Sequence, residues 1–194
     1  MRPTLVLRGV QVWQGLLDRA AQTGMVAYIR KIVAAAPLFS PMTPYGKAMS
    51  VQMTSAGRFG WVSDRNGYRY TDTHPDGRPW PEIPQSVRQV WDQVSESGRA
   101  PECCLVNLYR QTAKMGLHQD RDEGDFSHPV VSVSLGDDGL FRIGTTTRGG
   151  STESIWLKSG DVVVMGSDAR LVYHGIDKTR PGSSTLLSGG GGSI

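Results

Sequence analysis

The segment 116–123, GLHQDRDE, crowds three acidic side chains behind one histidine in a chain that has only 4 histidines. If this segment is extended, residues two apart project to the same side, so His118 and Asp120 could aim an imidazole and a carboxylate at one point. Such a pair suits a divalent metal ion. A solvated acidic loop would contain the same residue types, so the pair alone leaves both interpretations open.

A third ligand would favour the metal site, and His174 is the candidate. It lies in LVYHGI, just after the apolar run GDVVVM, and is expected on or beside a strand. Two histidines and one carboxylate on one face of an octahedron are typical of non-haem Fe(II), because three positions stay open for substrate and oxygen. A lone histidine there could equally be a hydrogen-bonded core residue. His74, in a Pro/Gly turn, and His128, before a proline, are predicted to lie in surface loops.

Other chemistries have less support in the sequence. The acidic cluster after His118 could supply paired carboxylates for hydrolysis, but no nucleophile accompanies it. The two cysteines, Cys103 and Cys104, are adjacent, which suits neither an ordinary disulfide nor a zinc site. We expect them to be reduced residues on a strand. The sequence has no G-x-x-x-x-G-K-[ST] loop and no G-x-S-x-G elbow.

Two helices are expected in the first half of the chain. Residues 15–36 have apolar side chains at helical spacing, with Pro37 as a stop. The segment 83–99, IPQSVRQVWDQVSESGR, has a stronger apolar stripe, with Gly98 placed to end it. Between them, residues 40–84 are rich in Gly, Pro, aromatic and charged residues, which predicts short strands and turns.

The second half is strand-like. Short β-rich runs at close intervals predict strands at residues 103–109, 130–135, 140–143, 153–157 and 161–165. Two helices followed by such strands predict an α+β fold, with a double-sheet roll or barrel that carries the helices on one side.

Composition is that of a globular protein, with 38% hydrophobic and 20% charged residues in 194. No run of about 18 apolar residues appears. The first residues show no signal-peptide pattern, so a cytoplasmic location without membrane association is expected. The net charge is +3, but residues 1–100 carry 12 Lys and Arg against 7 Asp and Glu, whereas residues 101–194 carry 9 against 11. This asymmetry is weak support for a polyanionic partner of the first half and a cation in the second.

Several ordered segments resemble the AlkB family of Fe(II)- and 2-oxoglutarate-dependent dioxygenases, most closely the bacterial type. They are CLVNLYRQTAKMGLHQDRDE, PVVSVSLG and GDVVVMGSDARLVYHGI, with MSVQMTSAGRFGW, GYRY and RPWPEIPQS upstream. The similarity spans about residues 37–187. It implies a double-stranded β-helix, or jelly-roll, within one dioxygenase domain over 1–187. Residues 40–84 would form a nucleotide-recognition lid, residues 101–187 the jelly-roll core, and residues 188–194 a flexible Gly-rich tail.

The resemblance also implies roles for individual residues. His118, Asp120 and His174 would bind the catalytic iron, and Asn107 and Tyr109 would contact 2-oxoglutarate. The implied substrate-binding residues are Trp61, Tyr68, Tyr70, Lys114, Asp122 and Arg148, of which Asp122 would face the damaged base. Without the family context, Trp61 and Tyr68 could also be ordinary packing residues. Glu123 is interpreted as a solvated neighbour.

The implied activity is oxidative demethylation of N-alkylated bases such as 1-methyladenine and 3-methylcytosine, in single- or double-stranded DNA and with RNA as a further candidate. O2 and 2-oxoglutarate would be consumed, and succinate, CO2 and formaldehyde released. The enzyme is expected to be a monomer. A hydroxylase of proteins or small molecules is disfavoured by the lid aromatics and Asp122.

The similarity breaks after residue 187. Family members continue into a last strand, approximately R-x-N-L-T-x-R, where this chain reads RPGSSTLLSGGGGSI. One arginine of that strand forms a bidentate salt bridge to 2-oxoglutarate, and Arg180 does not occupy a matching position. The printed chain is therefore predicted to bind Fe(II) but to turn over 2-oxoglutarate poorly. The alternative function is that of an impaired or truncated family member that only binds nucleic acid.

Overall fold

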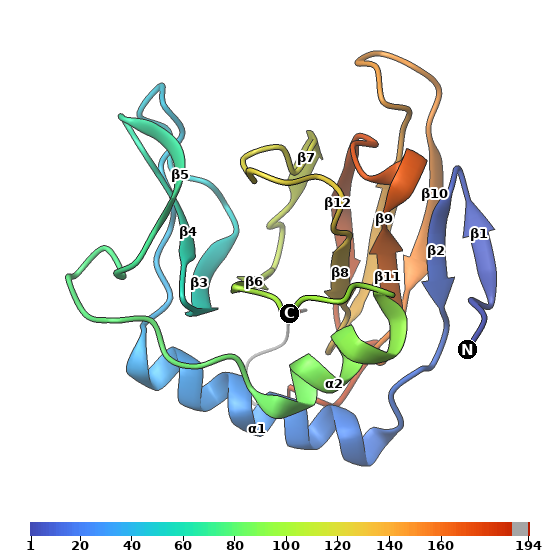
Figure 1. Ribbon diagram of the computed structural model, residues 1–194, viewed down its shortest axis with the longest axis horizontal. Helices are drawn as coiled ribbons and strands as arrows, with labels where there is room; N and C mark the ends of the chain where they lie inside the picture. Colours follow the sequence, from blue (N-terminus) through green and yellow to red (C-terminus); the bar gives the residue numbers. More distant parts are fainter. Residues whose placement is uncertain (188–193) are drawn as a thin grey trace.

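Two four-stranded antiparallel sheets form the framework of the protein (Figure 1). The computed structural model describes residues 1–187 and 194. The first sheet has the order β1-β2-β11-β8 and the second the order β10-β9-β12-β7. The first comprises β1 (Leu5–Leu7), β2 (Val10–Trp13), β11 (Val162–Met165) and β8 (Val130–Val133). The second comprises β10 (Glu153–Leu157), β9 (Asp138–Ile143), β12 (His174–Arg180) and β7 (Met115–His118).

Strand β11 lies at the centre of the core because both of its faces are buried. Its sequence, VVVM, has no exposed position. Val163 and Met165 pack with residues of the second sheet such as Phe141, whereas Val162 and Val164 pack against the helices. A strand covered on both faces is expected to be uniformly apolar rather than alternating. The first sheet is therefore the middle layer, between the second sheet and the helices.

Helix α1 (Arg19–Ala35) begins four residues later than predicted. The Asp18 side chain accepts a hydrogen bond from the Ala21 backbone N–H, which caps the helix and fixes its start. Gly15, which we expected inside the helix, has a φ of 62° and lies in the turn before it. Val26 and Ile29 are buried in the core and Val33 packs against it, as the helical spacing predicted.

Helix α2 (Gln85–Val94) ends before the predicted Gly98, because the chain leaves helical geometry at Glu96, with a φ of 50°. Val90 and Val94 are buried in the same cluster as the α1 residues. Both helices lie on one side of the sheets, along the bottom of Figure 1. The predicted α+β architecture, with a double-sheet core and helices on one side, is confirmed.

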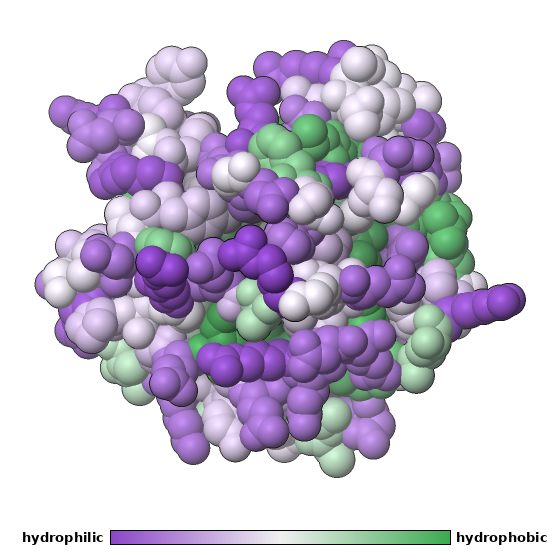
Figure 2. All heavy atoms as spheres, in the orientation of Figure 1, coloured by the Kyte–Doolittle hydropathy of each residue, from purple (hydrophilic) through white to green (hydrophobic). Residues whose placement is uncertain are grey.

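Two small antiparallel sheets lie beside the jelly-roll and occupy the left of Figure 1. One pairs β3 (Gln52–Gly57) with β6 (Cys103–Leu108), and the other is the hairpin of β4 (Gly60–Asp64) and β5 (Gly67–Thr71). The short strands predicted between residues 40 and 84 are therefore present. In the space-filling view of this face, hydrophilic residues predominate, and a notch at the top separates the part at the left from the jelly-roll (Figure 2).

All five strands predicted in the second half are present, with ends that differ by up to two residues. Strands β1, β2 and β7 had no counterpart in the sequence prediction. The predicted flexible tail lies outside the described residues apart from Ile194, whose backbone exchanges two hydrogen bonds with Leu135. Among the residues that the structure describes, no helix combines the length and apolar character needed to cross a membrane.

Candidate metal centre

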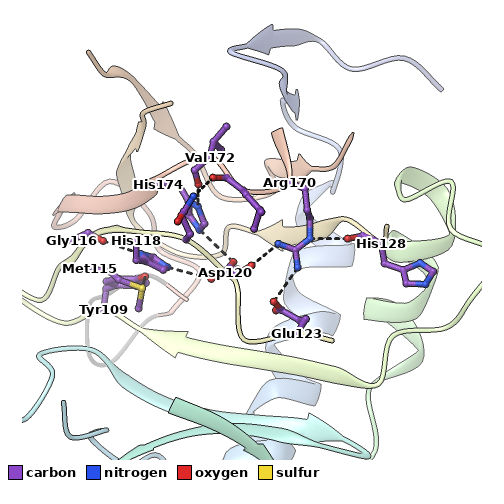
Figure 3. Close-up of polar contacts among 12 residues, drawn as sticks. Tyr109, Met115, Gly116, His118, Asp120, Glu123, His128, Arg170, Val172 and His174 are labelled. Atoms are coloured by element: carbon purple, nitrogen blue, oxygen red, sulfur yellow. Dashed lines mark hydrogen bonds and ion pairs between the residues drawn. The ribbon is translucent and has the colours of Figure 1, made fainter. Parts of the chain in front are cut away.

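Two strands of the second sheet bring His118 and His174 together (Figure 3). His118 ends β7, His174 begins β12, and the two are paired in the antiparallel register, with ring centroids 4.5 Å apart. Asp120 follows β7, and its Oδ1 and Oδ2 lie 3.5 Å from His118 Nε2 and 3.4 Å from His174 Nε2. One ligand atom from each residue lies within 4.8 Å of the others. The three residues predicted from the sequence therefore converge on one point.

Both imidazoles are oriented for metal binding by backbone carbonyls. His118 Nδ1 lies 2.9 Å from the Gly116 carbonyl oxygen, and His174 Nδ1 lies 3.0 Å from that of Val172. Because a carbonyl can only accept, each Nδ1 carries a proton, which leaves Nε2 as the atom that faces Asp120 and that can bind a metal ion once it is unprotonated. A fixed tautomer of this kind is the usual support for a metal-binding histidine. The donor set therefore fits the two-histidine, one-carboxylate site of non-haem Fe(II).

His118 and Asp120 change each other's pKa. Burial on its own raises the pKa of Asp120, but hydrogen bonds from His118 and His174 outweigh it and hold that pKa well below its usual range. For His118, burial lowers the pKa, but the hydrogen bond and charge of Asp120 more than compensate, so the pKa is raised. The carboxylate is thus permanently ionised, which is the state that binds a cation.

Gly175 allows the two histidine-bearing strands to approach closely. A Cβ at this position would collide with the Met115 carbonyl oxygen and lie 2.8 Å from that of Gly116. The β12–β7 register also shifts between His174 and Ile176. A glycine directly after His174 is therefore needed for the pairing that places the histidines.

Asn107 and Tyr109 lie on or directly after β6. Tyr109 is buried, and burial together with the charge of Asp120 raises its pKa, which keeps the phenol protonated near the triad. The buried Asn107 Oδ1 has no hydrogen-bond partner among the described residues. Arg180, at the other end of β12 from His174, lies 3.2 Å from Asp138 and stacks over Trp156.

The β4–β5 hairpin contacts the segment that follows the metal ligand Asp120. The rings of Trp61 and Tyr68 are stacked, with centroids 5.5 Å apart and an interplanar angle of 16°. Trp61 Nε1 donates to Asp122 Oδ2 at 2.9 Å, and the Tyr70 hydroxyl donates to Glu123 Oε1 at 2.9 Å. The structure thus brings the predicted lid residues onto the loop that carries the metal ligand.

The interpretation of Glu123 as a solvated residue is wrong. Its carboxylate lies between the Tyr70 hydroxyl and the buried guanidinium of Arg170, whose Nη2 is 3.1 Å from Glu123 Oε2. Arg170 was not predicted to contribute to the site at all. A buried arginine is uncommon, and nothing local in the sequence marks one.

The remaining polar candidates make no contact with the triad that the described residues show. Lys114 and Arg148 are exposed. Arg148 lines an open cavity of about 200 Å³ together with Leu117 and Tyr173, the neighbours of the two metal-site histidines. The prediction that His74 lies in a surface loop is wrong, because its side chain is buried. It packs against Phe39 and Trp80, and its Nε2 lies 2.9 Å from the Pro37 carbonyl oxygen.

His128 is partly buried, with its Nδ1 3.0 Å from the Ser97 hydroxyl. The two cysteines are free, as expected.

A jelly-roll whose second sheet brings a His-Asp-His triad together has the architecture of an iron oxygenase. In agreement, residues 9–191 match the 2OG-Fe(II) oxygenase superfamily. The alpha-ketoglutarate-dependent dioxygenase AlkB homolog of Caulobacter vibrioides is 49% identical over 191 residues, which cover 98% of this chain and 87% of that protein. The chain belongs to the AlkB family, and is a dioxygenase that depends on Fe(II), 2-oxoglutarate and O2.

Two further comparisons agree with this assignment. The alpha-ketoglutarate-dependent dioxygenase AlkB of Escherichia coli is 38% identical over 167 residues, covering 84% of this chain and 77% of that protein. The solved structure of OsALKBH1 has a TM-score of 0.78 at 28% identity and covers 98% of this chain and 96% of that one. The predicted family and jelly-roll fold are therefore confirmed.

Proposed function

We propose that this protein removes alkyl groups oxidatively from base nitrogens in DNA, with RNA as a second substrate. The observation that carries the proposal is the contact between Trp61 and Asp122, since it places an aromatic face and a carboxylate together two residues from the metal ligand Asp120. Enzymes that modify a base extrude it and hold it by stacking and by hydrogen bonds to its edge. Relatives named as DNA N(6)-methyladenine and tRNA demethylases agree with both substrates.

His118, Asp120 and His174 would hold Fe(II) from one side. With 2-oxoglutarate and O2, the metal supplies oxidation of an N-methyl group, so that carbon is lost as formaldehyde while 2-oxoglutarate becomes succinate and CO2. The chain contributes ligands of fixed tautomer and an ionised carboxylate. The amide N–H of Asn107 and the hydroxyl of Tyr109 would donate hydrogen bonds to the 2-oxoglutarate carboxylates.

Asp122 would select the damaged base. Its carboxylate is exposed and can accept from an exocyclic amino group. Methylation of adenine N1 or cytosine N3 produces a cationic ring, which a neighbouring carboxylate favours over the neutral base. Trp61 and Tyr68 form one aromatic stack, and such a stack would hold a nucleotide base by stacking.

Lys114 and Arg148 are suited to phosphate contacts, because both side chains are exposed cations. Residues 40–84 would act as the nucleotide-recognition lid within one dioxygenase domain whose jelly-roll core is residues 101–187. We further propose a monomer that acts in the cytoplasm. The two free cysteines agree with a reducing compartment.

The proposal is tested by incubating the protein with Fe(II), 2-oxoglutarate and oligonucleotides that contain 1-methyladenine or 3-methylcytosine. DNA and RNA of the same sequence are compared, and formaldehyde, succinate and the restored base are quantified. We expect formaldehyde and restored base in equal amounts, and loss of both in His118→Ala and His174→Ala. A protein that only binds nucleic acid would give salt-sensitive binding that survives both substitutions, without formaldehyde. That outcome would refute the demethylase function.

A further inference from the structure

The loop between β7 and β8 contacts a buried arginine, Arg170, which follows the 3-10 helix η1 (Ser167–Ala169). Arg170 Nη1 donates to the Asp120 carbonyl oxygen at 2.7 Å, and its Nε donates to the His128 carbonyl oxygen at 2.8 Å. These two acceptors lie near the opposite ends of the loop (Figure 3). One guanidinium therefore closes the loop that carries the metal-ligating carboxylate.

The same guanidinium contacts two further side chains of the loop. Its Nη2 pairs with Glu123 Oε2 at 3.1 Å, and it stacks over the ring of Phe126 at 5.3 Å. Arg170 is 5% exposed, so its charge is largely removed from water. Removing one partner of a buried ion pair is costly, because the remaining charge is left uncompensated. The positions of Glu123 and of the Asp120 backbone are thus tied to each other through Arg170.

Glu123 extends this connection to the β4–β5 hairpin. Its second oxygen, Oε1, accepts from the Tyr70 hydroxyl on β5 at 2.9 Å. Burial, followed by the charge of Glu123, raises the pKa of Tyr70, so the phenol remains a donor at any physiological pH. A continuous path of polar contacts therefore runs from Tyr70 through Glu123 and Arg170 to the backbone of Asp120.

The hairpin is attached to the rest of the protein by side-chain and loop contacts, including the buried Val62 and the hydrogen bond from Trp80 Nε1 to the Thr71 carbonyl oxygen. In the part of the chain that the structure describes, β4 and β5 form a sheet only with each other, and no strand ladder joins them to either jelly-roll sheet. Two side-chain hydrogen bonds join the hairpin to the loop that follows the metal ligand Asp120. They run from Tyr70 to Glu123 and from Trp61 to Asp122.

We propose that Arg170 and Glu123 are positioning residues that couple the β4–β5 hairpin to the metal centre, so that metal binding at Asp120 and ordering of the hairpin favour each other. Such coupling is reciprocal, because any change in the hairpin that alters metal affinity implies the reverse effect of the metal on the hairpin. The coupling concerns the metal and the hairpin alone and does not depend on the proposed nucleic-acid substrate.

The first test measures Mn(II) affinity by calorimetry without 2-oxoglutarate or nucleic acid. Tyr70→Phe removes only the hydroxyl, and we expect it to weaken Mn(II) binding roughly fivefold, the lower end of usual coupling. In a Glu123→Gln background the same substitution should have no further effect, because the path is already broken. Tyr28→Phe, on an exposed tyrosine of α1, is the matched control and should leave the affinity unchanged. Unchanged affinity in Tyr70→Phe, or two effects that simply multiply, would overturn the proposal.

The second test measures hydrogen exchange of residues 60–71 with and without Mn(II). In the wild-type protein, metal should slow exchange in this hairpin, and in Arg170→Lys, which keeps the charge but loses the forked geometry, that response should be lost. A purely structural role for Arg170 predicts faster exchange in both states with the metal response intact. If Arg170→Lys does not fold, Glu123→Gln provides the same comparison. A metal response of wild-type size in the folded variant contradicts the coupling.

Discussion

His118 and His174 are cross-strand partners, and the pairing of β7 with β12 brings their ring centroids to 4.5 Å apart. Strand β7 is only four residues long and lies at the edge of its sheet, so few contacts other than those with β12 hold it in register. The positions of the two histidine ligands therefore depend on how closely these two strands approach. That close approach requires Gly175, the residue directly after His174.

Gly175→Ala is expected to weaken metal binding without touching a ligand. The added Cβ would meet the Met115 and Gly116 carbonyl oxygens, so β7 must move away from β12 and carry His118 with it. We expect Mn(II) affinity to fall at least roughly tenfold and the free energy of unfolding to fall by about 1–3 kcal/mol. Calorimetric titration and urea unfolding measure the two effects.

Gly139→Ala is the matched control for that substitution. Gly139 lies in β9 of the same sheet, and a Cβ there would meet the Ile176 side chain at an ordinary 3.6 Å. Its metal affinity should remain that of the wild-type protein. Equal affinities in the two variants would show that the close approach at Gly175 does not set the site.

The two histidines should differ in their effect on stability although both bind metal. The His174 side chain is 9% exposed and tilts against Phe141, whereas that of His118 is 35% exposed. We expect His174→Ala to cost about 1–3 kcal/mol in metal-free protein and His118→Ala less than about 1 kcal/mol. Both should lose at least roughly 100-fold in Mn(II) affinity. A larger loss of stability from His118→Ala would contradict this expectation from burial.

Cys103 and Cys104 should react slowly with thiol reagents in the folded protein. Burial, with the charge of the neighbouring thiol, raises the pKa of Cys103 to about 12, and burial raises that of Cys104 to about 11. Because only the thiolate reacts, we expect modification at pH 8 to be roughly 100-fold slower than in urea, and to accelerate about tenfold per pH unit up to pH 10. Immediate reaction of either thiol at pH 7 in native protein would contradict this.

The three metal ligands could be predicted because each carries a distinctive side chain within an ordered family pattern. The extended geometry expected for His118 and Asp120 was only partly right, since β7 ends at His118 and Asp120 lies in the loop beyond it. β7 itself was not predicted, because MGLH is short, contains a glycine and becomes a strand only by pairing with β12.

The contacts of Arg170 and Glu123 could not be predicted from the sequence. The two residues are far apart in the chain, and their charges would normally favour solvent. Only the tertiary structure shows that the guanidinium is enclosed by the loop after His118 and that Glu123 faces inward to meet it. Patterns of residue type therefore located the metal ligands but not the residues that position them.

Metal binding is expected to weaken as the pH falls, beginning at a higher pH than for an isolated imidazole. His118 must lose a proton to bind a metal ion, and its raised pKa means that protons compete earlier. Asp120 does not take part in this competition, since its lowered pKa keeps it ionised. Below the pKa of His118, each drop of one pH unit should raise the dissociation constant for Mn(II) about tenfold, because one proton on His118 competes with the metal ion.

Asp122 provides a matched test of this pH dependence, because its charge is one of the causes that raise the pKa of His118. In Asp122→Asn, the decline in affinity should therefore move to lower pH, while affinity at pH 8 changes little. Mn(II) titrations between pH 5 and 8, followed by the electron paramagnetic resonance signal of free Mn(II), measure both curves. An affinity that stays constant down to pH 5, or coincident curves for the two proteins, would show that His118 is not the competing group.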